Sequence, residues 1–127
     1  MRVKIDTKEM FHVICMEEEI LSANMSAEMM EIIRKKQMDD TKSIILNCKS
    51  LGKIDVDALK SIKKIKEETY SAGKSFVLCS VIPELKSSIE DMYGEEIHIT
   101  PTESEAWDIV QMEEIERELG LGDEESL

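Results

Sequence analysis

Residues 43–48 read Ser-Ile-Ile-Leu-Asn-Cys and lead through a short loop to Ile-Asp-Val-Asp-Ala-Leu at residues 54–59, where a lysine-rich helix is expected to begin. The first run is apolar without alternation, as is typical of a central strand covered on both faces. A buried strand that leads into a helix presents the free N–H groups and the dipole of that helix to a ligand or partner. This turn holds two carboxylates but no glycine-rich phosphate loop, histidine or nucleophilic cysteine. These residues favour a recognition surface over a catalytic site.

The apolar pattern on both sides of this stretch predicts alternating strands and helices. Alternating or continuous apolar runs predict strands, and apolar residues three or four apart predict helices. The expected strands cover residues 3–5, 11–16, 43–48, 75–79 and 96–99, and the expected helices cover about 25–40, 55–72, 83–93 and 102–119. Helices between successive strands favour parallel pairing, whereas the tight turn at residues 7–9 requires one antiparallel pair. The prediction is an α/β domain with a mixed, mostly parallel sheet of about five strands and about four helices, in the order ββαβαβαβα.

Length and composition fit one domain at residues 1–119 and an acidic tail at residues 120–127. The chain has 127 residues, 42% of them hydrophobic, which is enough for a single core. No apolar run approaches the roughly 18 residues of a membrane span, and the first residues lack the apolar run of a signal peptide. Cys15, Cys48 and Cys79 each lie in an apolar run and form no CxxC pair, so we expect reduced core thiols without a disulfide or a zinc site. These features predict a cytoplasmic protein.

The charge is strongly acidic and unevenly distributed. The net charge is −12, which predicts no binding to nucleic acid or to an anionic membrane, because the field of the protein repels phosphate. Residues 101–127 contain ten acidic residues and one basic residue, whereas residues 49–66 contain six lysines and two aspartates. Both segments fit ordinary solvated helix faces, and the lysine-rich one also fits a basic face for a partner.

The last expected helix begins with a capping box. Thr102 and Glu105 have the spacing at which the hydroxyl accepts from the Glu105 N–H while the glutamate side chain returns to Thr102. Four apolar residues then follow at helical spacing, which predicts a shared face, with Trp107 at the edge of the core. These residues are Ile109, Met112, Ile115 and Leu119.

The order of the elements and five phrases resemble the STAS domain, the fold of bacterial anti-sigma factor antagonists and of the cytoplasmic tails of sulfate-type anion transporters. The family's signature is a buried strand, a loop and a phrase of the form I-D-S-S-G-L, for which this chain has Ile-Asp-Val-Asp-Ala-Leu at residues 54–59. The resemblance covers residues 3–110. The other similar phrases are Ile-Leu-Ser-Ala-Asn at 20–24, Ala-Gly-Lys at 72–74, Val-Ile-Pro-Glu-Leu at 81–85 and Ile-Thr-Pro-Thr-Glu-Ser-Glu-Ala at 99–106.

The resemblance implies a non-enzymatic regulator that binds an anti-sigma factor or related kinase-fold protein and takes part in partner switching. In such proteins the second serine of the signature is phosphorylated, and the unphosphorylated form binds the kinase. This chain has Asp57 at that position, so it has no hydroxyl to phosphorylate, and a carboxylate mimics phosphoserine only in part. The partner-binding residues that the resemblance implies are Asn24, Asp55, Val56, Asp57, Ala58 and Leu59.

The two aspartates also fit purely structural roles at the start of the helix. Asp55 fits a helix N-cap, and Asp57 fits the first helical turn, where the dipole favours a carboxylate. Two carboxylates two residues apart do not share a helix face, so no metal site is expected, and no cofactor or catalytic residue is predicted. His12 and His98 fit packed or surface positions. Two alternative functions stay open: a structural STAS module of a larger assembly, such as a stressosome-like particle, and a phospho-acceptor receiver-like domain. The expected oligomeric state is a monomer or a weak homodimer.

Overall fold

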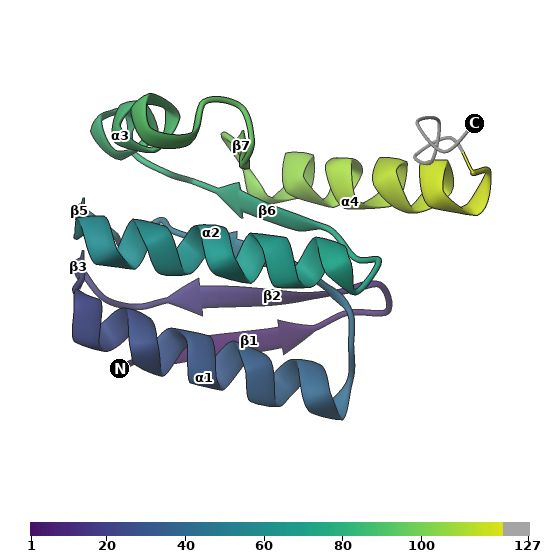
Figure 1. The fold of residues 1–127 in the computed structure, drawn as a ribbon, viewed down its shortest axis with the longest axis horizontal. Helices are drawn as coiled ribbons and strands as arrows, with labels where there is room; N and C mark the ends of the chain where they lie inside the picture. Colours follow the sequence, from purple (N-terminus) through teal and green to yellow (C-terminus); the bar gives the residue numbers. More distant parts are fainter. Residues whose placement is uncertain (121–127) are drawn as a thin grey trace.

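Seven strands and four helices make up residues 1–120, the part of the chain that the computed structural model describes (Figure 1). The strands are β1 (Val3–Thr7), β2 (Phe11–Met16), β3 (Ile20–Leu21), β4 (Ser43–Asn47), β5 (Lys53–Ile54), β6 (Phe76–Cys79) and β7 (His98–Thr100). The helices are α1 (Ala23–Asp39), α2 (Val56–Ser71), α3 (Pro83–Tyr93) and α4 (Glu103–Glu118). The four expected helices are present. Apart from Gly120, the expected acidic tail lies outside the described residues.

Five of the strands form one mixed sheet in the order β1-β2-β4-β6-β7. β1 and β2 form the expected antiparallel hairpin, and the other three pairs are parallel. β4 lies in the centre, with Ile45 opposite Val13 on one side and Val77 on the other, and all of its residues are buried. The predicted α/β class and the mixed, mostly parallel sheet are therefore confirmed.

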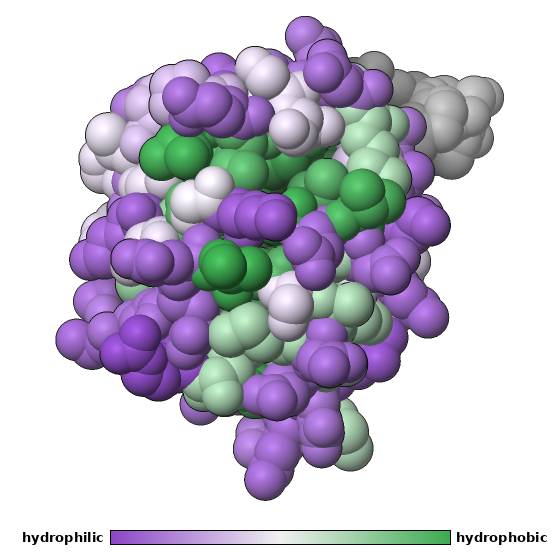
Figure 2. Space-filling view, turned by 90° about the vertical axis from the view of Figure 1, so that its left-hand side faces the viewer, coloured by the Kyte–Doolittle hydropathy of each residue, from purple (hydrophilic) through white to green (hydrophobic). Residues whose placement is uncertain are grey.

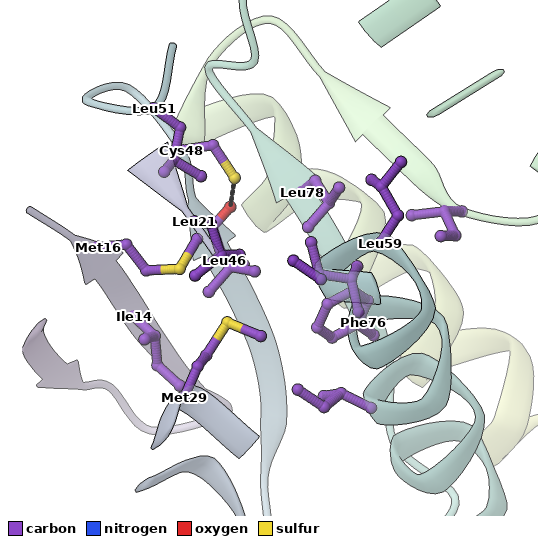
Figure 3. Packing of buried hydrophobic residues seen from close by; sticks show 14 of the residues in the cluster. Ile14, Met16, Leu21, Met29, Leu46, Cys48, Leu51, Leu59, Phe76 and Leu78 are labelled. Carbon is purple, nitrogen blue, oxygen red and sulfur yellow. Dashed lines mark hydrogen bonds between the residues drawn. The ribbon is translucent and has the colours of Figure 1, made fainter. Parts of the chain in front are cut away.

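Each face of the sheet carries its own hydrophobic core, because successive residues of a strand point to opposite faces. On one face, Ile44, Leu46 and Phe76 pack with residues of α1, α2 and α3. Figure 3 shows the side chains of Met29, Leu46 and Phe76 projecting into this shared interior from α1, β4 and β6. On the other face, the core under α4 contains Ile45 and Val77. The first core holds α2 against the sheet, and α2 carries the predicted recognition residues.

The cysteines and His12 belong to packed parts of the sheet. Cys48 and Cys79 are buried, Cys15 is half-buried, and all three are free thiols in the structure. Burial raises the pKa of each thiol, to about 11 for Cys79. His12 is buried in β2, and its Nε2–H donates to the carbonyl oxygen of Asp40 at 2.7 Å. These contacts give the four side chains a structural role.

The structure adds a second, two-stranded sheet that the apolar pattern does not predict. β3 and β5 pair in parallel, with Ile20 opposite Lys53 and Leu21 opposite Ile54. The pair joins the segment before α1 to the segment before α2. It therefore sets where both helices begin.

The first half of α4 follows the prediction, but the second half does not. The Thr102 hydroxyl accepts from the Glu105 N–H at 3.3 Å, and the same hydroxyl, not the backbone N–H, contacts the Glu105 carboxylate at 2.9 Å. Ala106 and Val110 form the buried face of the helix, and Trp107 packs at the edge of this core. Of the four apolar residues predicted to share a face, Ile109 packs against this core, but the other three are exposed: Met112, Ile115 and Leu119.

A polar network occupies the inner side of α4 where those apolar residues were expected. The Tyr70 hydroxyl of α2 donates to Glu113 Oε1 at 2.7 Å, and His98 Nε2 of β7 lies 3.1 Å from Glu113 Oε2. Burial alone raises the pKa of Glu113, but the hydrogen bonds from His98, Ser75 and Tyr70 outweigh burial and bring this pKa to about 2. The same bond to Glu113 raises the pKa of His98 above its usual value. Polar contacts to α2 and β7 thus fix the rotation of α4.

The His98–Glu113 pair predicts a pH dependence of stability. The folded state raises the pKa of His98, so the protonated imidazole contributes to the free energy of unfolding. This contribution is fully present below the unfolded pKa of about 6.5 and is lost as the pH rises through the folded pKa. The imidazole is about half exposed, so we expect a loss of less than about 1 kcal/mol. Urea unfolding at about four pH values between pH 5 and 9 gives the free energy of unfolding of the wild type and of His98→Gln, and the difference between the two is the contribution of His98. A difference that grows with rising pH would contradict the assignment.

Candidate protein-binding site

The predicted recognition residues lie at a corner of the molecule that is built by main-chain hydrogen bonds. After β4, the Cys48 N–H donates to the Cys79 carbonyl at 3.0 Å, which keeps the chain on the sheet. The N–H groups of Gly52 and Lys53 then donate to the Glu19 carbonyl, at 2.7 and 3.1 Å. These bonds bring the loop between β4 and β5 against the segment before α1. We call this region, around β3, β5 and the first turns of α1 and α2, the corner.

Asp55 is the N-cap of α2, as predicted, but its side chain does not cap the helix. Its backbone is extended, and its carbonyl accepts the first helical bond, from the Leu59 N–H at 3.0 Å. Its own N–H donates to the Leu21 carbonyl at 3.0 Å, so the link to β3 already fixes the entry of the chain into the helix. The side chain makes no capping bond. The predicted capping role of this carboxylate is therefore wrong.

Residues 56–59, which follow Asp55, lie partly at the surface and partly in the core. Val56 and Asp57 are exposed, at 59% for Val56 and 72% for the Asp57 side chain, and Asp57 lies in the first turn as predicted. The nearest cation to Asp57 is Lys60, at 3.9 Å. Ala58 and Leu59 are buried in the core between α2 and the sheet. Of these four residues, Val56 and Asp57 have side chains that a partner can contact directly.

Asn24 lies at the same corner, in the first turn of α1. Ser22 caps this helix through its hydroxyl, which accepts from the Met25 N–H at 3.3 Å, and Asn24 is exposed. A contact of 3.2 Å between the hydroxyls of Ser26 and Ser61 joins α1 and α2 near their N-terminal ends. The structure therefore brings Asn24 to the same end of the molecule as Val56 and Asp57.

The surface of the corner is partly apolar (Figure 2). Ile20 is 49% exposed, and Val56 adds a second exposed apolar side chain. A hollow of about 450 Å³ lies beside Ile20 and is also lined by Lys49, Lys53 and Ile82. Sequence reasoning did not identify Ile20 or Ile82 as site residues. An apolar centre with charged neighbours is the usual composition of a protein-binding surface.

Ser80 is a further feature of this end of the sheet that the sequence does not indicate. It follows β6 with φ at 60°, a conformation that is uncommon for a residue other than glycine. Its N–H donates to the Thr100 carbonyl at 3.1 Å. The turn leads the chain to Ile82, the N-cap of α3. Ser80 thus helps to place Ile82 beside the hollow.

The described residues contain no group of three His, Cys, Asp or Glu side chains arranged to hold a metal ion. A second hollow, of about 460 Å³, lies between α1 and α2 and is lined by Ile33, Met38 and Ile65. Arg34 and Glu68 at its rim form an ion pair with each other. Within residues 1–120, no helix is long and apolar enough to cross a membrane.

Fold and corner together define a small α/β domain with a mixed sheet and an exposed corner between strand and helix. Residues 2–106 match the family model described as the STAS domain, and the chain belongs to this family. A comparison with curated proteins gave no match.

Solved structures of similar fold include those of SpoIIAA, RsbS and TM1081. SpoIIAA of Bacillus in its phosphorylated form is 16% identical, with a TM-score of 0.67 over 86% of this chain and 99% of that chain. A serine-to-glutamate variant of RsbS from Moorella thermoacetica is 15% identical, with a TM-score of 0.73 over 87% and 96%. The Thermotoga maritima protein TM1081 is 19% identical, with a TM-score of 0.74 over 84% and 86%. The fold is thus the one found in SpoIIAA, which is described as an anti-sigma factor antagonist.

Proposed function

We propose that this STAS protein is a non-enzymatic regulator in the bacterial cytoplasm, similar to anti-sigma factor antagonists. It binds an anti-sigma factor or another kinase-fold protein through the corner, as one component of a partner-switching pathway. Asp57 occupies the position of the phosphorylated serine and supplies a permanent negative charge there. The observation that carries the proposal is the joint exposure of Asn24, Val56 and Asp57 at one end of the sheet.

The chemistry of the corner supports binding more than catalysis. Val56 and Ile20 offer apolar surface at the start of a helix, and burying such a side chain against a partner contributes about 1.5–3 kcal/mol. The corner has no histidine or accessible thiol, and the carboxylate of Asp57 lies in the open. A partner with a complementary apolar patch and a cation opposite Asp57 would fit this surface.

The proposal predicts that Val56→Glu weakens partner binding by about ten-fold or more, because a charge replaces an apolar contact at the centre of the surface. The measurement is isothermal titration against each purified kinase-fold anti-sigma factor encoded in the same genome. Met38→Glu is the matched control, because Met38 is exposed on α1 outside the corner, and it should bind like the wild type. Equal affinity of both variants, or no complex with any of these proteins, would contradict the proposal.

A further inference from the structure

The second half of α4 has the reverse of the usual amphipathic arrangement. Its inner side carries Glu113, which is bound to Tyr70 and His98, and Arg117, whose Nη2 donates to Ser75 Oγ at 2.9 Å. Its outer side, together with the C-cap residue Leu119, carries three large apolar side chains, which are 55%, 55% and 67% exposed: Met112, Ile115 and Leu119. A soluble helix normally turns its apolar side inward. An apolar line that faces solvent instead is a mark of an interaction surface.

These three residues, which we call the α4 stripe, have the spacing of a helix-pairing surface. They are three and then four residues apart, so their side chains lie in one line along about two turns. This spacing matches one side of a helix that packs lengthwise against another helix. The α4 stripe is separate from the corner, because α4 packs on the opposite face of the sheet from α2, and Figure 1 shows its last turns at the far end of the molecule from β5.

The charges beside the α4 stripe define the kind of helix that would fit. The charges around it on α4 are acidic: at helical spacing Glu116 and Glu118 lie beside the stripe, and Glu105 and Asp108 continue its line toward the start of the helix. The one basic residue of the helix, Arg117, is bound to Ser75 and to Glu114. A second copy of α4 would therefore place carboxylates against carboxylates, whereas lysine or arginine side chains would pair with them.

We propose that the α4 stripe binds an amphipathic helix with basic flanking residues, supplied by a partner protein. The apolar side of that helix covers Met112, Ile115 and Leu119, and its lysines or arginines pair with the carboxylates beside and in line with the stripe. This surface goes beyond the proposed function, because it lies outside the corner and can be occupied while the corner holds its own partner.

The test uses two synthetic helical peptides of about three heptads, with leucine at the a and d positions. One has lysine at the flanking positions and the other has glutamate. Fluorescence anisotropy at physiological salt should show binding of the lysine peptide and none of the glutamate peptide. The double variant Met112→Ser/Ile115→Ser keeps every charge of the protein and should bind the lysine peptide at least about ten-fold more weakly. The matched control Met38→Ser/Met92→Ser also removes two exposed apolar side chains and should bind like the wild type.

Three results would overturn this proposal. Equal binding by both double variants would mean that the peptide binds through the overall acidic charge of the protein and not through the stripe. No binding of the lysine peptide would mean that the stripe is not a docking surface for such a helix. A wild-type dimer in sedimentation experiments that Met112→Ser/Ile115→Ser dissociates would assign the stripe to a second copy of this chain. All four substituted side chains are exposed, so both variants should fold like the wild type.

Discussion

Replacing Phe76 with alanine is expected to lower the free energy of unfolding by about 3–5 kcal/mol. Phe76 is fully buried in β6, in the core that joins the sheet to α1, α2 and α3. Its removal leaves a cavity that the surrounding strands cannot close, because β4 lies directly beside β6 and is itself buried. Urea unfolding followed by circular dichroism and by fluorescence of Trp107 measures the loss. Trp107 reports on the other core, so coincident transitions would show that both cores unfold together.

Two further variants keep this measurement interpretable if the alanine variant does not fold. Ile62→Val removes one methylene group from the same core and should cost about 0.5–1.5 kcal/mol. Met38→Ala alters an exposed side chain and should change stability by less than about 0.5 kcal/mol. A loss below about 1.5 kcal/mol for Phe76→Ala would contradict the tight packing of α2 on the sheet, on which the position of the corner depends.

The parts of the fold that the sequence predicts correctly are those in which one physical preference dominates. The central strand is recognisable because it is buried on both faces and therefore loses all polar alternation, as observed for β4. The start of α4 is recognisable because a capping box is a local pattern, and the Thr102 hydroxyl does accept from the Glu105 N–H. The place of Asp57 in the first turn of α2 follows from the same kind of local signal.

The errors come from interactions between residues that are distant in the sequence. β3 and β5 have two residues each, too few to show a period, and each exists because it pairs with the other. Their pairing links the Asp55 N–H to the Leu21 carbonyl and so holds the main chain where it enters α2. The sequence predicts Asp55 at the N-cap, but it does not reveal the partner strand that binds the Asp55 backbone, nor that the carboxylate makes no capping bond.

The rotation of α4 is a second case of this kind. Spacing alone predicts that Met112, Ile115 and Leu119 lie on one side of the helix, and they do. Periodicity does not predict which side of a helix meets the sheet, and this side faces solvent. The side is chosen by Tyr70 and His98, which lie in α2 and β7 and hydrogen-bond to Glu113. A largely buried carboxylate such as Glu113 would be costly without these partners, so the polar side of α4 faces them.

The second large effect is expected from Asp57→Ser, which should convert the protein from a non-substrate into a substrate of a cognate anti-sigma factor kinase. The substitution restores the hydroxyl of the family signature at an exposed position in the first turn of α2. The helix dipole and the N–H groups of that turn favour the doubly charged phosphate, and Lys60 is near enough to pair with it. Mass spectrometry after incubation with the kinase and ATP should show one added phosphate on the variant and none on the wild type.

Two controls decide what the added phosphate means. Asp57→Ala removes the carboxylate without adding a hydroxyl and should take up no phosphate, and Asp57→Ser/Ser61→Ala should still take up one, because Ser61 lies a turn further along α2. Loss of the carboxylate costs only about 0.3–1 kcal/mol of dipole interaction, so the variants remain folded. Phosphate on Asp57→Ser would mean that the corner still fits a kinase and that Asp57 alone blocks the switch. Absence of phosphate, in a variant that still binds the kinase, would mean that the surface has lost the geometry for phosphoryl transfer and that Asp57 is part of a permanent binding surface.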